Sequence, residues 1–212
     1  MNLEETLIYR IVHIDNLDYI LQNNKLTTYG NVDSDCNYVG IGEGELINLR
    51  TNHNISTTNS GIEYCPSCDF LPFYFASKSV MLFRIKTGWN VAKVEQEKII
   101  YFVYKLSDII DQVNYLLTDG HGYARITQWF DDIQYINQLN KEDITRTWWN
   151  NTEEDGDRER RKQAEFWIEN EISLNLAKGI GVYNENALHL VQELCNKHGR
   201  KIEIKVKPQY YY

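Results

Sequence analysis

The segment 157–168, with the sequence DRERRKQAEFWI, constrains the fold of this chain most, because it joins a basic run to an apolar run. The apolar residues recur at intervals of three and four positions, at Ala164, Trp167, Ile168 and Ile172. This spacing is typical of one face of a helix. We therefore predict an amphipathic helix over 157–172, with its apolar face on the core.

Glu165 lies inside that apolar run. A carboxylate in such a position must be paired or used in chemistry, because an unpaired buried charge is costly or titrates away. On a helix, Arg161 and Lys162 lie four and three residues before Glu165, and pairing with them would keep it ionised at neutral pH. The alternative is a solvated basic helix face with Glu165 at its margin.

The composition is that of a globular protein with one core. The chain has 212 residues, of which 42% are hydrophobic and 25% charged, so we expect a single domain over residues 1–212. No apolar run approaches the roughly 18 residues of a membrane-spanning helix, and no secretory signal is visible near the amino terminus. We therefore expect a cytoplasmic protein.

The formal net charge of −8 argues against non-specific binding to duplex DNA, which depends on clustered lysine and arginine. Two short basic clusters stand out against this acidic whole. One is Arg158 to Lys162, and the other runs from Lys201 through Lys205 and Lys207 into three closing tyrosines. These clusters leave room for a local nucleic-acid groove, and the 27 aromatic residues offer faces for base stacking, 15 Tyr, 7 Phe and 5 Trp.

Four cysteines are present, Cys36, Cys65, Cys68 and Cys195. Cys65 and Cys68 have the two-residue gap of a zinc knuckle or a redox pair, but the second pair of ligands that a structural zinc site needs is missing. Cys36 and His53 could complete such a site only if the chain folded back across a loop. We predict reduced thiols and no bound metal.

Periodicity and turn residues predict a mixture of strands and helices. Strands are expected at 8–14, 70–76, 80–85, 98–104, 180–183 and 202–206. Helices are expected at 17–24, 107–117, 129–139, 142–149, 157–172 and 185–197. A polar loop fills 27–68, with a brief ordered segment at 45–50, and loops of this length are more often functional than simple connections. Since strands and helices do not alternate regularly, the predicted fold class is α+β.

The best-known catalytic signatures are missing from the sequence. The segment 40–44 lacks the spacing of a dinucleotide-binding or phosphate-binding loop, and no serine lies in a nucleophile elbow. A scattered polar set remains: His13, Arg50, His121 and Glu165. The glycines around His121 would let its ring approach a ligand closely. The alternatives are a strand-end His13 bonded to a backbone carbonyl and a surface position for Arg50.

Four blocks of sequence resemble, in order and spacing, the DarT family of DNA ADP-ribosyltransferase toxins. They are Ile8 to Leu17 (IYRIVHIDNL), Leu71 to Phe75 (LPFYF), Asp119 to Gly122 (DGHG) and Arg160 to Phe166 (RRKQAEF). A looser similarity at 129–132, 181–184 and 211–212 extends it over nearly the whole chain. The segment 65–68 departs from the pattern as a local insertion.

The resemblance implies an ADP-ribosyltransferase-like split β-sheet with surrounding helices. It also implies that NAD is the co-substrate and that ADP-ribose passes to a base of single-stranded DNA while nicotinamide leaves. Thymidine is favoured over guanosine as the target. A macrodomain antitoxin of the DarG type is the partner that the family leads us to expect.

The resemblance also assigns roles to residues of this chain. Glu165 is the implied catalytic carboxylate, and Arg50 is the implied loop arginine that holds the diphosphate or handles a proton. The other implied contacts with NAD are His13, Asn16 and Tyr74, and those with DNA are His121, Arg158 and Arg161.

Two other functions remain open at this point. An NAD glycohydrolase or a protein-directed ADP-ribosyltransferase would use the same cofactor site and release nicotinamide without DNA. A non-catalytic nucleic-acid-binding module would use the basic clusters and the aromatic residues and leave NAD intact.

Overall fold

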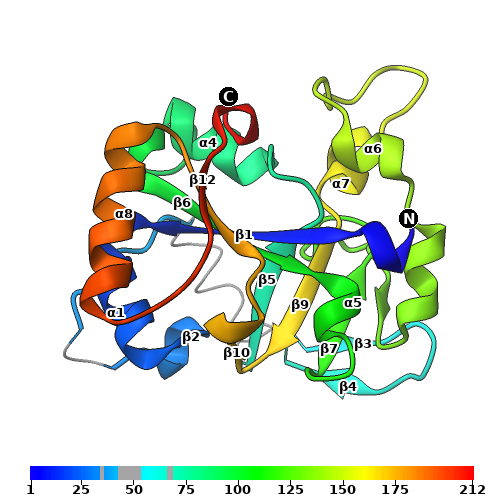
Figure 1. Ribbon diagram of the computed structural model, residues 1–212. Helices are drawn as coiled ribbons and strands as arrows, with labels where there is room; N and C mark the ends of the chain where they lie inside the picture. The colour runs from blue at the N-terminus through cyan, green and yellow to red at the C-terminus, as the bar shows by residue number, and fades with distance from the viewer. Residues whose placement is uncertain (34–35, 43–53, 66–68) are drawn as a thin grey trace.

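The computed structural model describes residues 1–33, 36–42, 54–65 and 69–212, and its main feature there is a mixed sheet of eight strands (Figure 1). Across this sheet the order is β12 (Ile204–Val206), β11 (Gly179–Val182), β6 (Ile99–Lys105), β1 (Leu7–His13), β5 (Phe70–Tyr74), β9 (Glu165–Glu169), β7 (Tyr115–Thr118) and β8 (Trp129–Phe130). Two short ladders lie outside it, β2 (Lys25–Thr27) with β10 (Glu171–Ser173) and β3 (Ile55–Ser56) with β4 (Glu63–Tyr64).

The described helices surround this sheet. They are α1 (Leu17–Asn23), α4 (Val80–Thr87), α5 (Leu106–Ile109), α6 (Lys141–Thr145), α7 (Arg158–Lys162) and α8 (Glu185–Lys197). Figure 1 shows α1 and α8 together at one end of the molecule and the carboxy terminus beside α4. β1 pairs with β6 along its whole length but with β5 only through Tyr9 and Tyr74, so the sheet splits there. This arrangement confirms the predicted α+β class.

The two faces of the sheet carry different apolar clusters. One face, which includes Ile8, Val12 and Phe166, packs against α1 and α8 in the largest cluster. The other face carries two smaller clusters. One is built around Tyr101 with α4, and the other around Trp167 with β3 and β4. Since side chains alternate along a strand, each buried strand supplies both faces.

The carboxy-terminal residues close the face that carries α4. The Tyr211 hydroxyl donates to the carbonyl of Ile99 in β6 at 2.7 Å. The side chain of Gln96 makes two hydrogen bonds with the backbone of Tyr212. Its Nε2 donates to the Tyr212 carbonyl at 2.7 Å, and its Oε1 accepts from the Tyr212 N–H at 2.8 Å. The second basic cluster of the sequence therefore ends on the sheet rather than in solvent.

Most elements with a single clear periodicity are where the sequence predicts them. β1, β5, β6, β11 and the edge strand β12 overlap the predicted strands, and α1 and α8 overlap the predicted helices. Helix α8 covers the predicted range 185–197, and Asn184 caps it by accepting from the N–H of Ala187.

The helix predicted over 157–172 is wrong. The chain is helical only in α7, and Glu165 is the first residue of the strand β9. Phe166 and Ile168 face the largest cluster while Trp167 faces the opposite side. A strand that is buried on both faces has apolar residues at every position, so a helical spacing also occurs within it by coincidence.

Three other predicted segments also change type. The segment 80–85, predicted as a strand, lies in the helix α4. The hydroxyl of Ser79 caps this helix by accepting from the N–H of Leu82, and the helix ends at Gly88, which has a left-handed backbone conformation. The helix at 107–117 is α5 followed by the strand β7, and the helix at 129–139 is β8 followed by a 3-10 helix. The helix at 142–149 shortens to α6.

The long polar segment 27–68 is only partly described. It contains β3 and β4, and the brief segment predicted at 45–50 lies outside the described residues. In the described part of the chain, no helix has both the length and the apolar character that a bilayer crossing requires.

Lys162, in α7, is a buried lysine whose only described hydrogen bond is to the carbonyl of Ile144, at 2.6 Å. Burial first, and the nearby positive charges of Arg146 and Lys78 next, lower the pKa of Lys162 from 10.5 to about 8. Because the native pKa is the lower one, the unfolded state binds more protons between these values. The contribution of Lys162 to stability therefore rises as the pH increases from about 8 to 10.5.

We expect Lys162→Met to raise the free energy of unfolding near pH 7 by about 1–2 kcal/mol. Desolvation and the nearby positive charges together cost the buried ammonium on the order of 3 kcal/mol. This cost exceeds the loss of one hydrogen bond, about 1 kcal/mol. Urea unfolding of variant and wild type, followed from neutral to alkaline pH, checks this. The stability difference should shrink as the pH rises, and a variant that is less stable at pH 7 would contradict the expectation.

Candidate active site

Glu165 lies at the start of β9, between the two clusters on the face that carries α4. Its side chain is only 3% exposed. Its Oε2 accepts from the backbone N–H of Gly122 at 3.3 Å, and its own N–H donates to the hydroxyl of Thr118 at 3.0 Å. The carboxylate is thus held beside the loop that joins β7 to β8.

Thr118, the last residue of β7, connects three parts of this site. Its hydroxyl donates to the carbonyl of Gly120 at 2.7 Å while it accepts from the N–H of Glu165. Thr118 is completely buried, so both groups would lose a partner without it. This role could not be predicted from the sequence, because a threonine at a strand end has no distinctive spacing.

Arg160 of α7 holds the loop that follows Thr118. Its guanidinium contacts Asp157 through Nε at 2.7 Å and Asp119 through Nη1 at 2.8 Å. Its carbonyl accepts from the N–H of His121 at 2.9 Å. The hydroxyl of Thr127 donates to the carbonyl of His121 at 2.7 Å, which closes the loop on itself. Helix α7 and this loop therefore form one hydrogen-bonded unit beside Glu165.

The two glycines around His121 provide space rather than backbone freedom. A Cβ on Gly120 would lie 2.8 Å from Cγ of Arg160, and a Cβ on Gly122 would lie 3.0 Å from the ring of Trp129 and 3.2 Å from Oε2 of Glu165. Neither residue has a positive φ. The close approach of this loop to Glu165 is what requires glycine.

His13 ends β1 and lies on the same sheet face as Glu165. Tyr74 pairs with both Tyr9 and Glu165, and paired residues of an antiparallel ladder share a face. His13 is four residues after Tyr9 and so shares that face too. The structure thus brings His13, Tyr74 and Glu165 to one side of the sheet.

The His13 ring is neutral near pH 7. Burial lowers its pKa, and this effect outweighs the neighbouring Asp15 carboxylate, which acts in the opposite direction. Nδ1 accepts from the N–H of Asp15 at 3.2 Å, so the proton of the neutral ring lies on Nε2. The ring therefore offers one N–H donor, and its backbone partner is an N–H rather than the carbonyl considered from the sequence.

Asn16 has both ends of its side chain on the backbone of Val39. Nδ2 donates to the carbonyl at 2.9 Å, and Oδ1 accepts from the N–H at 2.7 Å. The amide is 2% exposed. In this arrangement Asn16 orders the segment 36–42 rather than pointing a free amide at a ligand.

The arginines of α7 face aspartates. Arg161 contacts Asp143 and Asp155 at 2.7 Å each and Asp157 at 3.4 Å, and Arg158 contacts Asp155 at 3.2 Å. The hydrogen bond from Arg161 is the main cause that holds the pKa of Asp155 well below its usual value. These arginines are therefore already neutralised within the protein.

The pairing of Glu165 with Arg161 and Lys162, predicted from a helix, is wrong. Arg161 contacts the aspartates and Lys162 a backbone carbonyl, and neither reaches Glu165 in the described structure. The reason is the strand geometry: Glu165 follows the end of α7, so the spacing of a helix no longer applies.

Arg50 lies outside the described residues, as do His53 and Cys68. Cys36 and Cys195 are free thiols. In the ranges that the structure covers, no three histidine, cysteine or carboxylate side chains converge as a metal site would need.

Comparisons with known proteins identify relatives over nearly the whole chain. The family model described as "ssDNA thymidine ADP-ribosyltransferase, DarT" matches residues 9–212. A DNA ADP-ribosyl transferase of Escherichia coli O127:H6 is 26% identical over 214 residues, which is 100% of this chain and 96% of that relative.

Solved structures show the same fold. The DarT of Thermus sp. 2.9 in complex with ADP-ribosylated ssDNA is 25% identical with a TM-score of 0.87, covering 99% of this chain and 97% of that one. The same protein with NAD+ gives a TM-score of 0.81 at 25% identity, covering 99% and 98%. The DarTG of Thermosipho africanus with ADP-ribose has a TM-score of 0.72 at 17% identity, and this chain covers 51% of it.

We expect Thr118→Val to lower the free energy of unfolding by about 1–3 kcal/mol. The isosteric side chain keeps the packing but leaves the N–H of Glu165 and the carbonyl of Gly120 without their hydroxyl partner. Thr118→Ser is the matched control, because it keeps the hydroxyl. Urea unfolding measures both, and equal stability of the valine variant and wild type would contradict the role of this hydroxyl.

Proposed function

Because this chain belongs to the DarT family, we propose that thymidine is the base it modifies and that Glu165 is its catalytic carboxylate. The protein is an NAD-dependent enzyme that transfers ADP-ribose to single-stranded DNA. The observation that carries the assignment of Glu165 is its burial at the start of β9, in hydrogen-bond contact with the glycine loop.

The chemistry needs a fixed negative charge. When the bond between ribose C1′ and the nicotinamide nitrogen breaks, its electron pair leaves with nicotinamide and positive charge develops on the sugar, as in glycoside cleavage. A carboxylate held in place stabilises that charge and orients a ribose hydroxyl. The ring nitrogen of thymine then forms the new bond to C1′ and loses its proton. Glu165 has the position and the support for this role.

The other residues on this face suit the rest of NAD. The neutral His13 offers an Nε2 N–H to a ribose hydroxyl or carbonyl, and the half-buried ring of Tyr74 offers a stacking surface beside Glu165. Bound NAD supplies the activated glycosidic bond. Asn16 acts by ordering the segment 36–42, since Val39 occupies its amide.

Arg50 completes the proposed set on the strength of the family resemblance. A planar, permanently charged guanidinium suits the diphosphate of NAD better than it suits proton transfer. His121, in the loop that contacts Glu165, is proposed to meet the target nucleotide. Arg158 and Arg161 retain a proposed part in DNA binding, in which their aspartate partners limit the charge that they offer.

The proposed partner is a macrodomain protein of the DarG type that removes the modification, and the proposed compartment is the cytoplasm. Support comes from the family and from the DarTG protein of Thermosipho africanus, which is longer than this chain. Co-expression of such a macrodomain should restore growth to cells that produce the enzyme.

The test of the function uses purified protein, NAD and oligonucleotides that differ in one base. We expect a mass gain of one ADP-ribose, with release of nicotinamide, only on single strands that contain thymidine. Modification of guanosine instead would overturn the base assignment. Nicotinamide release at the same rate without DNA would identify an NAD glycohydrolase.

We expect Glu165→Gln to lower kcat by about 100- to 1,000-fold, the usual cost of removing one preorganised electrostatic group. Glu169→Gln is the matched control on the same strand, because Glu169 bonds to Asn114 at 2.7 Å away from the loop. Steady-state transfer rates and thermal unfolding check both variants. A Glu165 variant that loses stability but keeps its rate would assign a structural role instead.

We expect Gly122→Ala to lower kcat/KM by about tenfold or more, because overpacking of a tight site costs about 1–3 kcal/mol. The added methyl group would displace the Trp129 ring or the carboxylate of Glu165. Gly156→Ala is the control, since a Cβ there meets nothing within 4 Å. Equal rates for both variants would show that the loop can move away from Glu165 without loss.

A further inference from the structure

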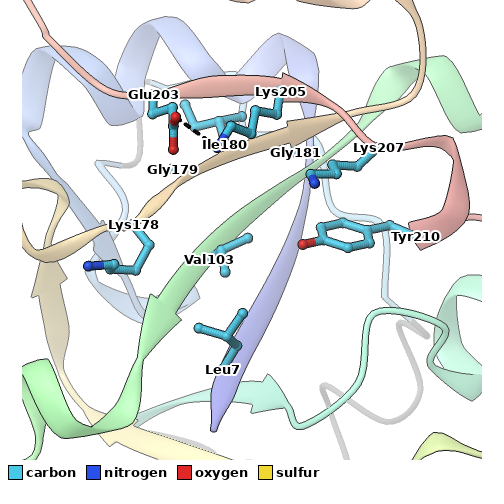
Figure 2. Close-up of a pocket in the computed structure, with 10 residues that line it drawn as sticks. All are labelled: Leu7, Val103, Lys178, Gly179, Ile180, Gly181, Glu203, Lys205, Lys207 and Tyr210. Carbon is cyan, nitrogen blue, oxygen red and sulfur yellow. Dashed lines mark ion pairs between the residues drawn. The ribbon is translucent and has the colours of Figure 1, made fainter. Parts of the chain in front are cut away.

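A basic pocket lies on the same sheet face as Glu165, at the other side of the split sheet (Figure 2). It encloses about 180 Å³, and its lining comes from β1, β6, β11, β12 and the carboxy-terminal segment. Its polar residues are Lys178, Glu203, Lys205, Lys207 and Tyr210. Leu7 and Val103 lie at its apolar floor, as Figure 2 shows.

The lysines of this pocket differ in their partners. Lys205 contacts Glu203 at 2.8 Å and Lys178 contacts Asp108 at 3.2 Å. Lys207 is half-buried, and its ammonium contacts no carboxylate in the parts of the chain that the structure covers. The pocket therefore carries positive charge that no carboxylate of the described residues neutralises, although the whole chain has a net charge of −8.

Tyr210 gives the pocket a hydroxyl and an aromatic wall. The centroid of its ring lies 5.4 Å from that of the Tyr9 ring, in an edge-to-face arrangement. The pKa of Tyr9 is raised, mainly by burial and to a lesser extent by the nearby Tyr210 hydroxyl. Gly181 permits this arrangement, because a Cβ there would lie 3.1 Å from the Tyr210 ring. The pocket thus combines the Tyr210 hydroxyl, the Lys207 ammonium and an apolar floor, which suits a phosphodiester next to a sugar or base.

The sheet register links this pocket to Glu165. Val103 pairs with Tyr9, Tyr9 with Tyr74, and Tyr74 with Glu165. Three steps between neighbouring strands, at about 4.8 Å each, place the pocket floor roughly 15 Å from Glu165. That distance is roughly four nucleotides of a stacked strand at about 3.4 Å each. The half-buried ring of Tyr9 lies between the two points and can stack on a base.

The distribution of charge favours this pocket over α7 as the place where the DNA backbone binds. Arg158 and Arg161, the basic residues of α7 with a proposed part in DNA binding, already contact Asp143, Asp155 and Asp157. A strand that crosses the face would carry a negative charge at each nucleotide and gain most from a cation without a partner. Among the residues that the structure describes, Lys207 has no carboxylate partner and is such a cation.

We propose that the pocket formed by Lys178, Lys205, Lys207 and Tyr210 binds a backbone phosphate of the single-stranded DNA substrate, a few nucleotides from the modified base. The inference rests on the proposed function. A phosphate could also come from the diphosphate of NAD, and the experiment has a separate arm for each source.

The experiment measures binding of a fluorescent oligonucleotide to Lys207→Ala, Lys207→Arg and wild type over a range of salt concentrations. We expect the alanine variant to bind several-fold more weakly, with the slope of log K against log salt smaller by about 0.7, the value for one phosphate on a single strand. The arginine variant should restore the slope. Lys197→Ala is the control, because α8 covers the opposite face of the sheet.

Two further arms decide the source and the position of the phosphate. The KM for NAD should be unchanged in Lys207→Ala, and a raised KM for NAD with an unchanged DNA slope would overturn the inference. The position is tested with two oligonucleotides that contain one thymidine, one with a long flank only on its 5′ side and one with a long flank only on its 3′ side. Lys207→Ala should weaken the binding of one of them and leave the binding of the other unchanged. If the variant weakens the binding of neither, the inference is also overturned. Failure of wild-type protein to modify any oligonucleotide would instead contradict the proposed function.

Discussion

The register between β5 and β9 decides where the carboxylate of Glu165 lies. Tyr74 pairs with Glu165 while Phe73 pairs with Phe166, and the two phenylalanines point into the largest apolar cluster. A slip of one residue would send the carboxylate into that cluster and bring Phe166 to the loop. The cost of burying an unpaired charge there therefore protects the geometry of the site. The contacts of Thr118 and Gly122 with Glu165 depend on this register.

The sequence predicts those elements in which one periodicity dominates. Helix α8 has a polar exposed face and a capping asparagine, and β6 is apolar along its length, so each has a single interpretation. The segment 157–172 failed because a strand buried on both faces carries apolar residues at all spacings, including three and four. The segment 80–85 was predicted as a strand from its apolar composition. The prediction did not take into account Ser79 and Gly88, the residues that cap the two ends of the helix α4.

The candidate site was predictable in part. Glu165, His13 and His121 could be named from ordered blocks of sequence, whereas Thr118 and Arg160 could not, because their roles exist only across the folded chain. Arg160 contacts Asp119, which lies 41 positions earlier in the sequence, and no local pattern encodes such a contact. The basic run was identified correctly as a feature, but its charge could not be judged without the aspartates that face it.

The chain order of the sheet has a consequence for the time at which activity arises. β9 lies between β5 and β7, and both of these strands come before it in the chain. Synthesis begins at the amino terminus and proceeds at about 5–20 residues per second. The strands on either side of Glu165 thus leave the ribosome before it does. A nascent chain therefore lacks this carboxylate until residue 165 of 212 has been added, although the strands that will hold it are already made.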